Sequence, residues 1–225
     1  MAFITELVQN LENNIKQFEA DFPSTGFEKS DLKQHPDITL LTCADSRMPA
    51  TIFGPIFNRI FSVENIGNQY ENNAGSVLYG LLHLKTPLLI IAGHTDCGAI
   101  KGALSDFSNE PLPIKRELSS LRNVLEDIKK TTTLPTSEAE DIQITKLAEL
   151  NLDRQINNVL TNEEVNSLVT ENQLLILGVM ADLHNIYQNG YGKIYISNYN
   201  GVNNIETIKY KLPKTFNQSR IKRLS

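Results

Sequence analysis

Two polar clusters carry the residues best suited to chemistry, and each directly follows an apolar run. Residues 42–47 follow one such run, and residues 91–98 complete another. The clusters contain both cysteines of the chain, Cys43 and Cys97, together with His94. Apolar runs of this kind are typical of buried parallel strands, and ligands bind where such strands end. We therefore expect the two clusters to form one site.

His94 and Cys97 have the spacing of two ligands to one metal ion. They are three residues apart across an expected strand-to-helix turn, where Gly98 would ease the tight backbone. Zinc suits them, because it accepts thiolate sulfur and imidazole nitrogen, and three protein ligands leave a tetrahedral position for water. Cys43 would be the third ligand. Two buried thiols and a hydrogen-bonded histidine fit the spacing equally well.

Asp45 and Arg47 favour the metal site. Charged groups at the end of a buried strand are costly to desolvate unless they pair with each other or face a site. An aspartate paired with arginine stays ionised and can accept a hydrogen bond from a metal-bound water, while the arginine fixes its direction. The alternative is an ion pair with a structural role only.

The surrounding pattern predicts an α/β fold, with a mostly parallel central sheet of about four strands, an antiparallel edge strand and flanking helices. Asn73 is expected to cap a helix at 74–84, and Thr161 to open a capping box for a short helix ending at Val169. A turn at Asn189 should fold the last strand back. The expected strands are residues 38–42, 60–63, 88–92, 174–180 and 193–197, and the other expected helices are 98–104, 114–130 and 144–159.

Bulk properties exclude several classes of function. The net charge of −5, with scattered basic residues, argues against a nucleic-acid surface, and the basic residues 220–223 are expected to form a solvated end. No apolar run approaches the roughly 18 residues needed to cross a bilayer, so we expect no membrane insertion. The first residues include Glu6 and lack a basic leader, which predicts a cytoplasmic protein. In a reducing compartment, the cysteines are buried thiols, a redox pair or metal ligands.

At these residues the sequence resembles the plant-like branch of the β-class carbonic anhydrases, whose zinc site is built from C-x-D-x-R and H-x-x-C. Residues 43–47 and 94–97 have this pattern, and residues 65–68 follow the order of the family. The resemblance covers nearly the whole chain. It implies one Zn²⁺ per subunit and reversible hydration of CO₂ to bicarbonate and a proton by zinc-bound hydroxide. The zinc ligands implied are Cys43, His94 and Cys97, and the catalytic dyad is Asp45 with Arg47.

The same resemblance implies that Asp45 can swing onto zinc as a fourth ligand in a closed state. It also implies a homodimer or a larger assembly of dimers, because part of the pocket for CO₂ and bicarbonate comes from a neighbouring subunit. Residues 1–36 would be an N-terminal helical arm packing on the partner, and residues 37–225 the zinc-binding α/β catalytic domain of a single-domain chain. The arm has an apolar stripe at helical spacing, made of Phe3, Leu7, Leu11, Ile15 and Phe18.

Five residues match the substrate pocket of the family. They are Gln34, nine residues before the first zinc cysteine, together with Phe61, Ile66, Tyr79 and Gly98. From spacing alone, the aromatic and aliphatic members fit ordinary core packing.

Two positions depart from the family pattern. Glu64 replaces a usual arginine, and Leu40 stands where the branch with an inhibitory bicarbonate site has tryptophan, so we expect that site to be absent. Three other functions stay open on the same residues. They are hydrolysis of CS₂ or COS at the zinc site, a non-catalytic zinc-stabilised bicarbonate-binding scaffold, and a redox-regulated dithiol protein.

Overall fold

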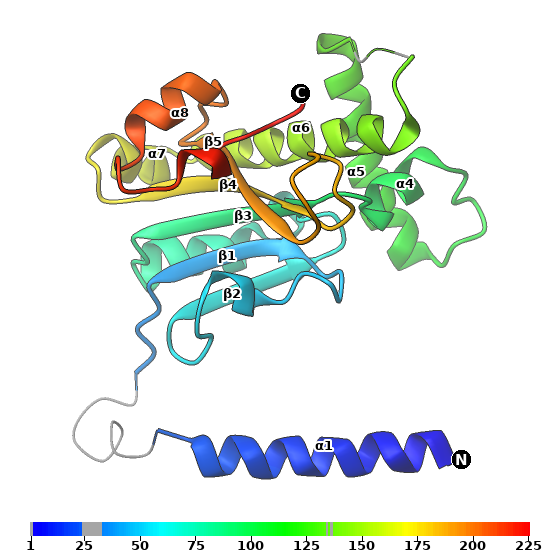
Figure 1. The fold of residues 1–225 in the computed structure, drawn as a ribbon, viewed down its shortest axis with the longest axis vertical. Coiled ribbons are helices and arrows are strands. Elements are labelled where there is room, and N and C mark those ends of the chain that lie inside the picture. Colours follow the sequence, from blue (N-terminus) through cyan, green and yellow to red (C-terminus); the bar gives the residue numbers. More distant parts are fainter. Residues whose placement is uncertain (1, 24–32, 134, 136) are drawn as a thin grey trace. The chain divides into compact units, whose positions relative to one another are not determined.

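The computed structural model describes residues 2–23, 33–133, 135 and 137–225. The chain divides into two compact units, Met1–Gln34 and His35–Ser225. The first unit contains helix α1 (Ala2–Asp21), as the apolar periodicity predicts. The apolar side chains of α1 remain exposed, with Phe3 at 71% and Leu11 at 57%. All other elements belong to the second unit (Figure 1).

Five strands form one sheet in the order β2-β1-β3-β4-β5. The first four in this order run parallel, and β5 is antiparallel to β4. The expected α/β class, with a mostly parallel sheet and an antiparallel edge strand, is therefore confirmed. The strands are β1 (Ile38–Cys43), β2 (Ile60–Asn65), β3 (Leu88–His94), β4 (Leu175–Asp182) and β5 (Lys193–Tyr199).

Apolar side chains cover both faces of this sheet, which explains why the central strands read as continuous apolar runs. Successive residues of a strand point to opposite faces, so Leu41 and Ile91 enter one core while Leu40 and Ile90 enter the other. The first core is closed by α3 (Ala74–Leu78), η3 (Tyr79–His83), α4 (Gly98–Leu104), α5 (Leu112–Thr131), α6 (Glu140–Leu160) and α7 (Glu163–Thr170). The second is closed by η1 (Ala50–Phe53) and α8 (Ile205–Lys211).

The strand register brings the two polar clusters to one edge of the sheet. Thr42 pairs with Ala92, so β1 and β3 end side by side, and His94 pairs with Ala181 of β4. Figure 1 shows α4 at the end toward which β1 and β3 point. The carboxyl ends of three neighbouring parallel strands therefore converge where the sequence places its chemistry.

Three local expectations are wrong. Asn73 makes no capping hydrogen bond, because the 3₁₀-helix η2 (Glu71–Asn73) runs directly into α3. The helix expected at 74–84 changes to a π-helix at Tyr79, which widens its last turn. The short helix α7 is capped by Asn162, whose side chain accepts from the Val165 amide, and not by Thr161.

The basic residues 220–223 are only partly a solvated end. Ile221 is 4% exposed and bridges to Ile196 of β5. The Arg223 side chain, 6% exposed, pairs with Asp153 at 2.8 Å. The last residues of the chain therefore pack against the edge of the sheet and α6, after the 3₁₀-helix η4 (Gln218–Arg220).

Candidate metal centre

Three metal-ligating side chains meet at the carboxyl edge of the sheet. Cys43 ends β1, His94 ends β3, and Cys97 is the N-cap residue of α4. Their ligand atoms all lie within 4.8 Å of one another, and the residues are 5%, 0% and 2% exposed. Within the part of the chain that the structure describes, they are the group of His, Cys, Asp and Glu side chains suited to hold a metal ion.

The imidazole of His94 has the hydrogen bonding expected of a metal ligand. Its Nδ1 is 2.9 Å from the Thr95 carbonyl oxygen, to which it donates. This fixes the tautomer that leaves the lone pair on Nε2. That Nε2 is buried and has no hydrogen-bond partner. Because an orphaned buried nitrogen faces two thiols, the residues fit a tetrahedral thiolate and imidazole site of the kind that zinc prefers.

The two thiols interact strongly with each other. Hydrogen bonding by Cys97, helped by the electrostatic effect of His94, lowers the pKa of the Cys43 thiol to about 4. The interaction with Cys43 raises the pKa of Cys97 well above its ordinary value. Neither cysteine forms a disulfide. The two buried sulfurs are therefore close enough to interact, and a cation held between them would replace the thiol protons.

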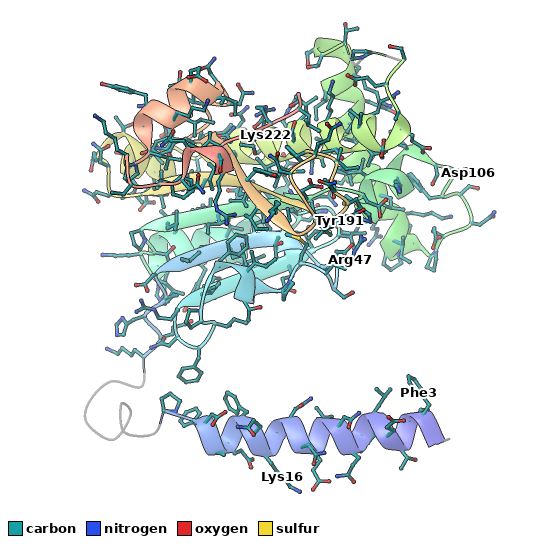
Figure 2. All side chains as sticks on the ribbon, viewed as in Figure 1. Phe3, Lys16, Arg47, Asp106, Tyr191 and Lys222 are labelled. Atoms are coloured by element: carbon teal, nitrogen blue, oxygen red, sulfur yellow. The ribbon has the colours of Figure 1, made fainter. Side chains whose placement is uncertain are left out.

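Asp45 and Arg47 form a bidentate ion pair beside this cluster. Arg47 Nε is 2.9 Å from Asp45 Oδ1, and Nη2 is 2.7 Å from Oδ2. These hydrogen bonds hold the pKa of the Asp45 carboxyl well below its usual range. Asp45 Oδ2 also lies 3.8 Å from His94 Nε2. Arg47, labelled in Figure 2, is thus positioned to direct an ionised carboxylate toward the ligand cluster.

Gly98 does not have the role expected from the turn. The left-handed residue there is Asp96, with φ of 59°, whereas Gly98 starts α4 with ordinary helical backbone. A Cβ atom at Gly98 would meet nothing within 4 Å. The left-handed conformation in this turn is therefore adopted by Asp96, and aspartate is a residue type that tolerates it.

A group of charged residues at the rim was missed by the sequence reasoning. The Asp96 carboxylate contacts Lys101, lies 3.5 Å from Arg47 Nη1 and 3.5 Å from His184 Nε2. The hydrogen bond from Lys101 lowers the pKa of Asp96. His184 follows β4, whose end lies beside His94 in the sheet. The apolar run of β4, which ends at Asp182 and is followed closely by His184, was the available signal.

The expected pocket residues do not all lie at the cluster within one chain. Ile66, 37% exposed, follows Asn65, which pairs with Cys43, so it lies near the ligands. Phe61 contacts Tyr79, with ring centroids 5.9 Å apart. However, Phe61 pairs with Thr39, four residues before Cys43, which is about 13 Å along a strand.

Gln34 belongs to the other unit of the chain and is exposed. Glu64 is exposed and accepts a hydrogen bond from Ser62 Oγ at 2.8 Å. Leu40 is fully buried in the second core. The two positions that depart from the family pattern are therefore an exposed carboxylate and a core side chain.

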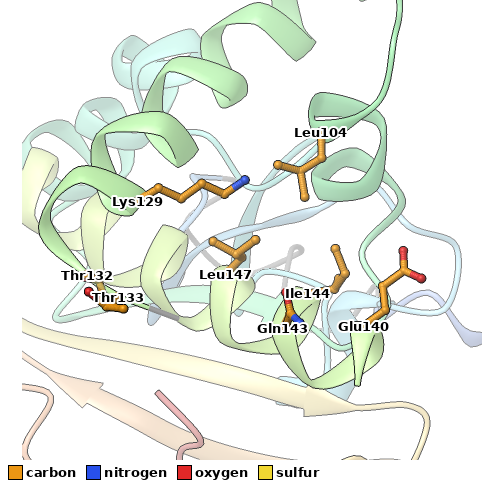
Figure 3. Close-up of a pocket in the computed structure, with 8 residues that line it drawn as sticks. All are labelled: Leu104, Lys129, Thr132, Thr133, Glu140, Gln143, Ile144 and Leu147. Atoms are coloured by element: carbon orange, nitrogen blue, oxygen red, sulfur yellow. The ribbon is translucent and has the colours of Figure 1, made fainter. Parts of the chain in front are cut away.

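A cavity of about 530 Å³ lies elsewhere, between α4, α5 and α6 (Figure 3). Both polar and apolar side chains line it, among them Lys129, Glu140 and Leu147, and it includes none of the three candidate metal ligands. In the described ranges, no helix combines the length and apolar character required to cross a bilayer.

Known proteins resemble the chain in both sequence and fold. The family model for carbonic anhydrase matches residues 38–190, most of the chain. A carbonic anhydrase from Saccharomyces cerevisiae is 28% identical over 159 residues, covering 65% of this chain and 70% of the relative. A carbonic anhydrase from Helicobacter pylori is 29% identical over 206 residues, covering 83% of this chain and 88% of the relative.

Solved structures of carbonic anhydrases also match the fold of this chain. A tetrameric β-carbonic anhydrase from the filamentous ascomycete Sordaria macrospora matches with a TM-score of 0.67 at 27% identity, covering 87% of this chain and 96% of that one. The residues that the family model matches include Cys43, His94 and Cys97. The chain therefore belongs to the β-class carbonic anhydrase family.

Proposed function

We propose that the protein catalyses the reversible hydration of CO₂ to bicarbonate and a proton, with Zn²⁺ held by Cys43, His94 and Cys97. The observation that carries the proposal is the buried Nε2 of His94, which lacks a hydrogen-bond partner and lies within ligand range of two thiols. When bound there, zinc would supply a Lewis acid that makes water a nucleophile near neutral pH.

The protein ligands tune this chemistry through their charge. Two thiolates and a neutral imidazole cancel the charge of Zn²⁺, whereas three neutral histidines would leave it uncompensated. A metal ion held by Cys43, His94 and Cys97 would therefore lower the pKa of its water less than one held by three imidazoles. We expect activity to rise on the alkaline side of neutrality.

Asp45 and Arg47 act as an orienting pair in this proposal. Arg47 occupies one lone pair of each carboxylate oxygen of Asp45 through its Nε and Nη2. The remaining lone pair of Oδ2, 3.8 Å from His94 Nε2, is available to accept a hydrogen bond from the reacting water. Asp45 can become a fourth ligand and close the site only if its hydrogen bonds to the Arg47 side chain break.

The substrate pocket is proposed to form between subunits from Gln34, Phe61, Ile66, Tyr79 and Gly98. Phe61 contacts Tyr79 but lies far along its strand from the candidate ligands of its own chain, which favours a contribution to the site of a neighbour. A homodimer or an assembly of dimers would supply it, as the tetrameric fungal relative suggests. The exposed apolar side chains of α1 would then pack on the partner.

A cytoplasmic location is part of the proposal, because both cysteines must stay reduced to bind the metal. The decisive experiment is stopped-flow CO₂ hydration by the purified protein alongside its zinc content. We expect one zinc per chain and rapid hydration. Stoichiometric zinc without hydration would overturn the proposal, and hydrolysis of CS₂ or COS by the same sample would reassign the substrate.

A further inference from the structure

His184 lies at the rim of the metal centre, although no spacing in the sequence links it to the ligands. It is the second residue after β4, in a sheet where His94 pairs with Ala181. The Thr95 amide donates to the Ala181 carbonyl, and the Leu183 amide donates to the Thr95 hydroxyl, both at 2.9 Å. These bonds hold His184 against the turn that carries two of the ligands.

Each ring nitrogen of His184 has a partner. Nδ1 is 3.4 Å from Thr95 Oγ1, and Nε2 is 3.5 Å from Asp96 Oδ2. In the neutral ring, Nε2–H points at the carboxylate while Nδ1 accepts the hydroxyl proton of Thr95. In the protonated ring both nitrogens donate, and the rotatable hydroxyl presents a lone pair to Nδ1 instead. The same contacts therefore serve both protonation states.

The charges facing His184 come from three other elements and from its own. Asp96, in the turn between β3 and α4, faces Nε2. The same carboxylate contacts Arg47 after β1, 3.5 Å from Nη1, and Lys101 of α4. Asp182, which ends β4, accepts two backbone N–H groups of its own turn. Arg47 and Lys101 therefore share the carboxylate that faces His184.

The same contacts connect the buried centre to the surface. The side chain of His184 is 41% exposed, whereas His94 is fully buried. Asp96 Oδ2 lies 3.5 Å from Arg47, which holds Asp45, whose Oδ2 is 3.8 Å from His94 Nε2. Guanidinium does not release its proton. Arg47 therefore links the carboxylate nearest His94 to the carboxylate that faces His184.

We infer that His184 takes up the proton released by hydration and passes it to buffer in solution, an inference that rests on the proposed function. Hydration converts CO₂ and water into bicarbonate and one proton. The imidazole lone pair accepts that proton to give imidazolium, and a buffer base then removes it and restores the neutral ring. His184 makes and breaks no bond of CO₂. It therefore sets the rate of proton transfer and not that of the CO₂ interconversion.

The test compares zinc-loaded full-length wild type with His184→Ala and His184→Gln. Hydration is measured by stopped flow at low and high buffer concentration. Interconversion is measured by oxygen-isotope exchange between CO₂ and bicarbonate at equilibrium, which needs no proton transfer to buffer. At low buffer, kcat of both variants should fall about tenfold or more while kcat/KM and the exchange rate stay unchanged. Imidazole added to the solution should restore kcat.

His35→Ala is the matched control, because the bond from His35 to Asn58 Oδ1 uses the backbone N–H and survives the change. The inference is overturned if His184→Gln keeps the wild-type kcat at low buffer. A parallel fall of kcat and kcat/KM without rescue by imidazole also overturns it, since that is the signature of a structural role. Wild-type protein that binds zinc but hydrates no CO₂ overturns the proposed function itself.

Discussion

Arg47 holds both carboxylate oxygens of Asp45, with Nε 2.9 Å from Oδ1 and Nη2 2.7 Å from Oδ2. The backbone N–H of Arg47 also donates to Oδ1 at 2.9 Å. Three hydrogen bonds from one residue fix the plane of the carboxylate and keep it ionised. The Asp45 side chain is 17% exposed and that of Arg47 is 43% exposed, so the carboxylate is the more buried member of the pair.

Replacing Arg47 by alanine should abolish most activity while zinc stays bound. The three candidate ligands are untouched, but the Asp45 carboxylate loses its fixed direction, so kcat/KM should fall by about a hundredfold or more. Stopped-flow hydration and metal analysis on the same sample measure both quantities. Arg59→Ala is the control, because its pair with Asp37 is exposed at the surface. Near-normal turnover by Arg47→Ala would remove the pair from the mechanism.

Bound metal should protect both thiols from reaction. In zinc-loaded native protein, Cys43 and Cys97 are expected to be coordinated, so neither should react with a thiol reagent such as dithionitrobenzoate. Removal of zinc with a chelator should make both thiols reactive. Denatured protein provides the reference signal for complete reaction of the two cysteines of the chain. Two freely reactive thiols in native, metal-replete protein would instead identify a redox dithiol protein.

Glu149 on α6 should make stability depend on pH. The residue is fully buried, accepts a hydrogen bond from Tyr187 Oη at 2.5 Å, and its burial raises the carboxyl pKa above 4.5. The native state then binds this proton more tightly than the unfolded chain. The contribution of Glu149 to stability is therefore largest below pH 4.5 and is lost as pH rises through the native pKa.

Denaturant unfolding gives the free energy of unfolding of wild type and of Glu149→Gln. The stability of wild type relative to the variant should increase as pH falls from about 7 to about 5. Glu206→Gln is the control, since Glu206 is 80% exposed in its side chain. A difference that stays constant over this range would show that Glu149 does not titrate there.

The strands and the clustering of Cys43, His94 and Cys97 could be predicted because they depend on local patterns. Apolar runs on both faces mark the buried strands, and parallel strands that end together bring Cys43 near His94. His184 could not be predicted, since it meets the site only through the pairing of β3 with β4. The left-handed turn residue, Asp96 and not Gly98, likewise depends on backbone geometry that residue type alone does not determine.

Inhibition by bicarbonate should be simple and not cooperative. Glu64 is an exposed carboxylate and Leu40 a fully buried core residue, so neither offers the cationic or indole group of the inhibitory site in the family. A carboxylate at position 64 repels an anion. Initial rates over a bicarbonate series at several pH values measure this. Steep cooperative inhibition at alkaline pH would contradict it, and Glu64→Gln tests whether the carboxylate is the cause.

The ion pair between Arg223 and Asp153 should contribute strongly to stability. The two side chains are 6% and 10% exposed, and Arg223 Nη2 lies 2.8 Å from Asp153 Oδ2. Asp153 also accepts from the side-chain amides of Asn198 and Asn203. Removing the guanidinium leaves a buried carboxylate without its cation, so Arg223→Ala should cost about 3 kcal/mol in the free energy of unfolding.

Denaturant unfolding measures this loss, and Lys209→Ala is the matched control. Its pair with Glu206 is exposed, so its removal should change stability by less than about 0.5 kcal/mol. Asp153→Asn combined with Arg223→Ala removes the uncompensated charge and keeps an amide for the neighbouring asparagines, so the double variant should be more stable than Arg223→Ala alone. An equally small loss in Arg223→Ala and in Lys209→Ala would show that solvent reaches the Arg223 pair.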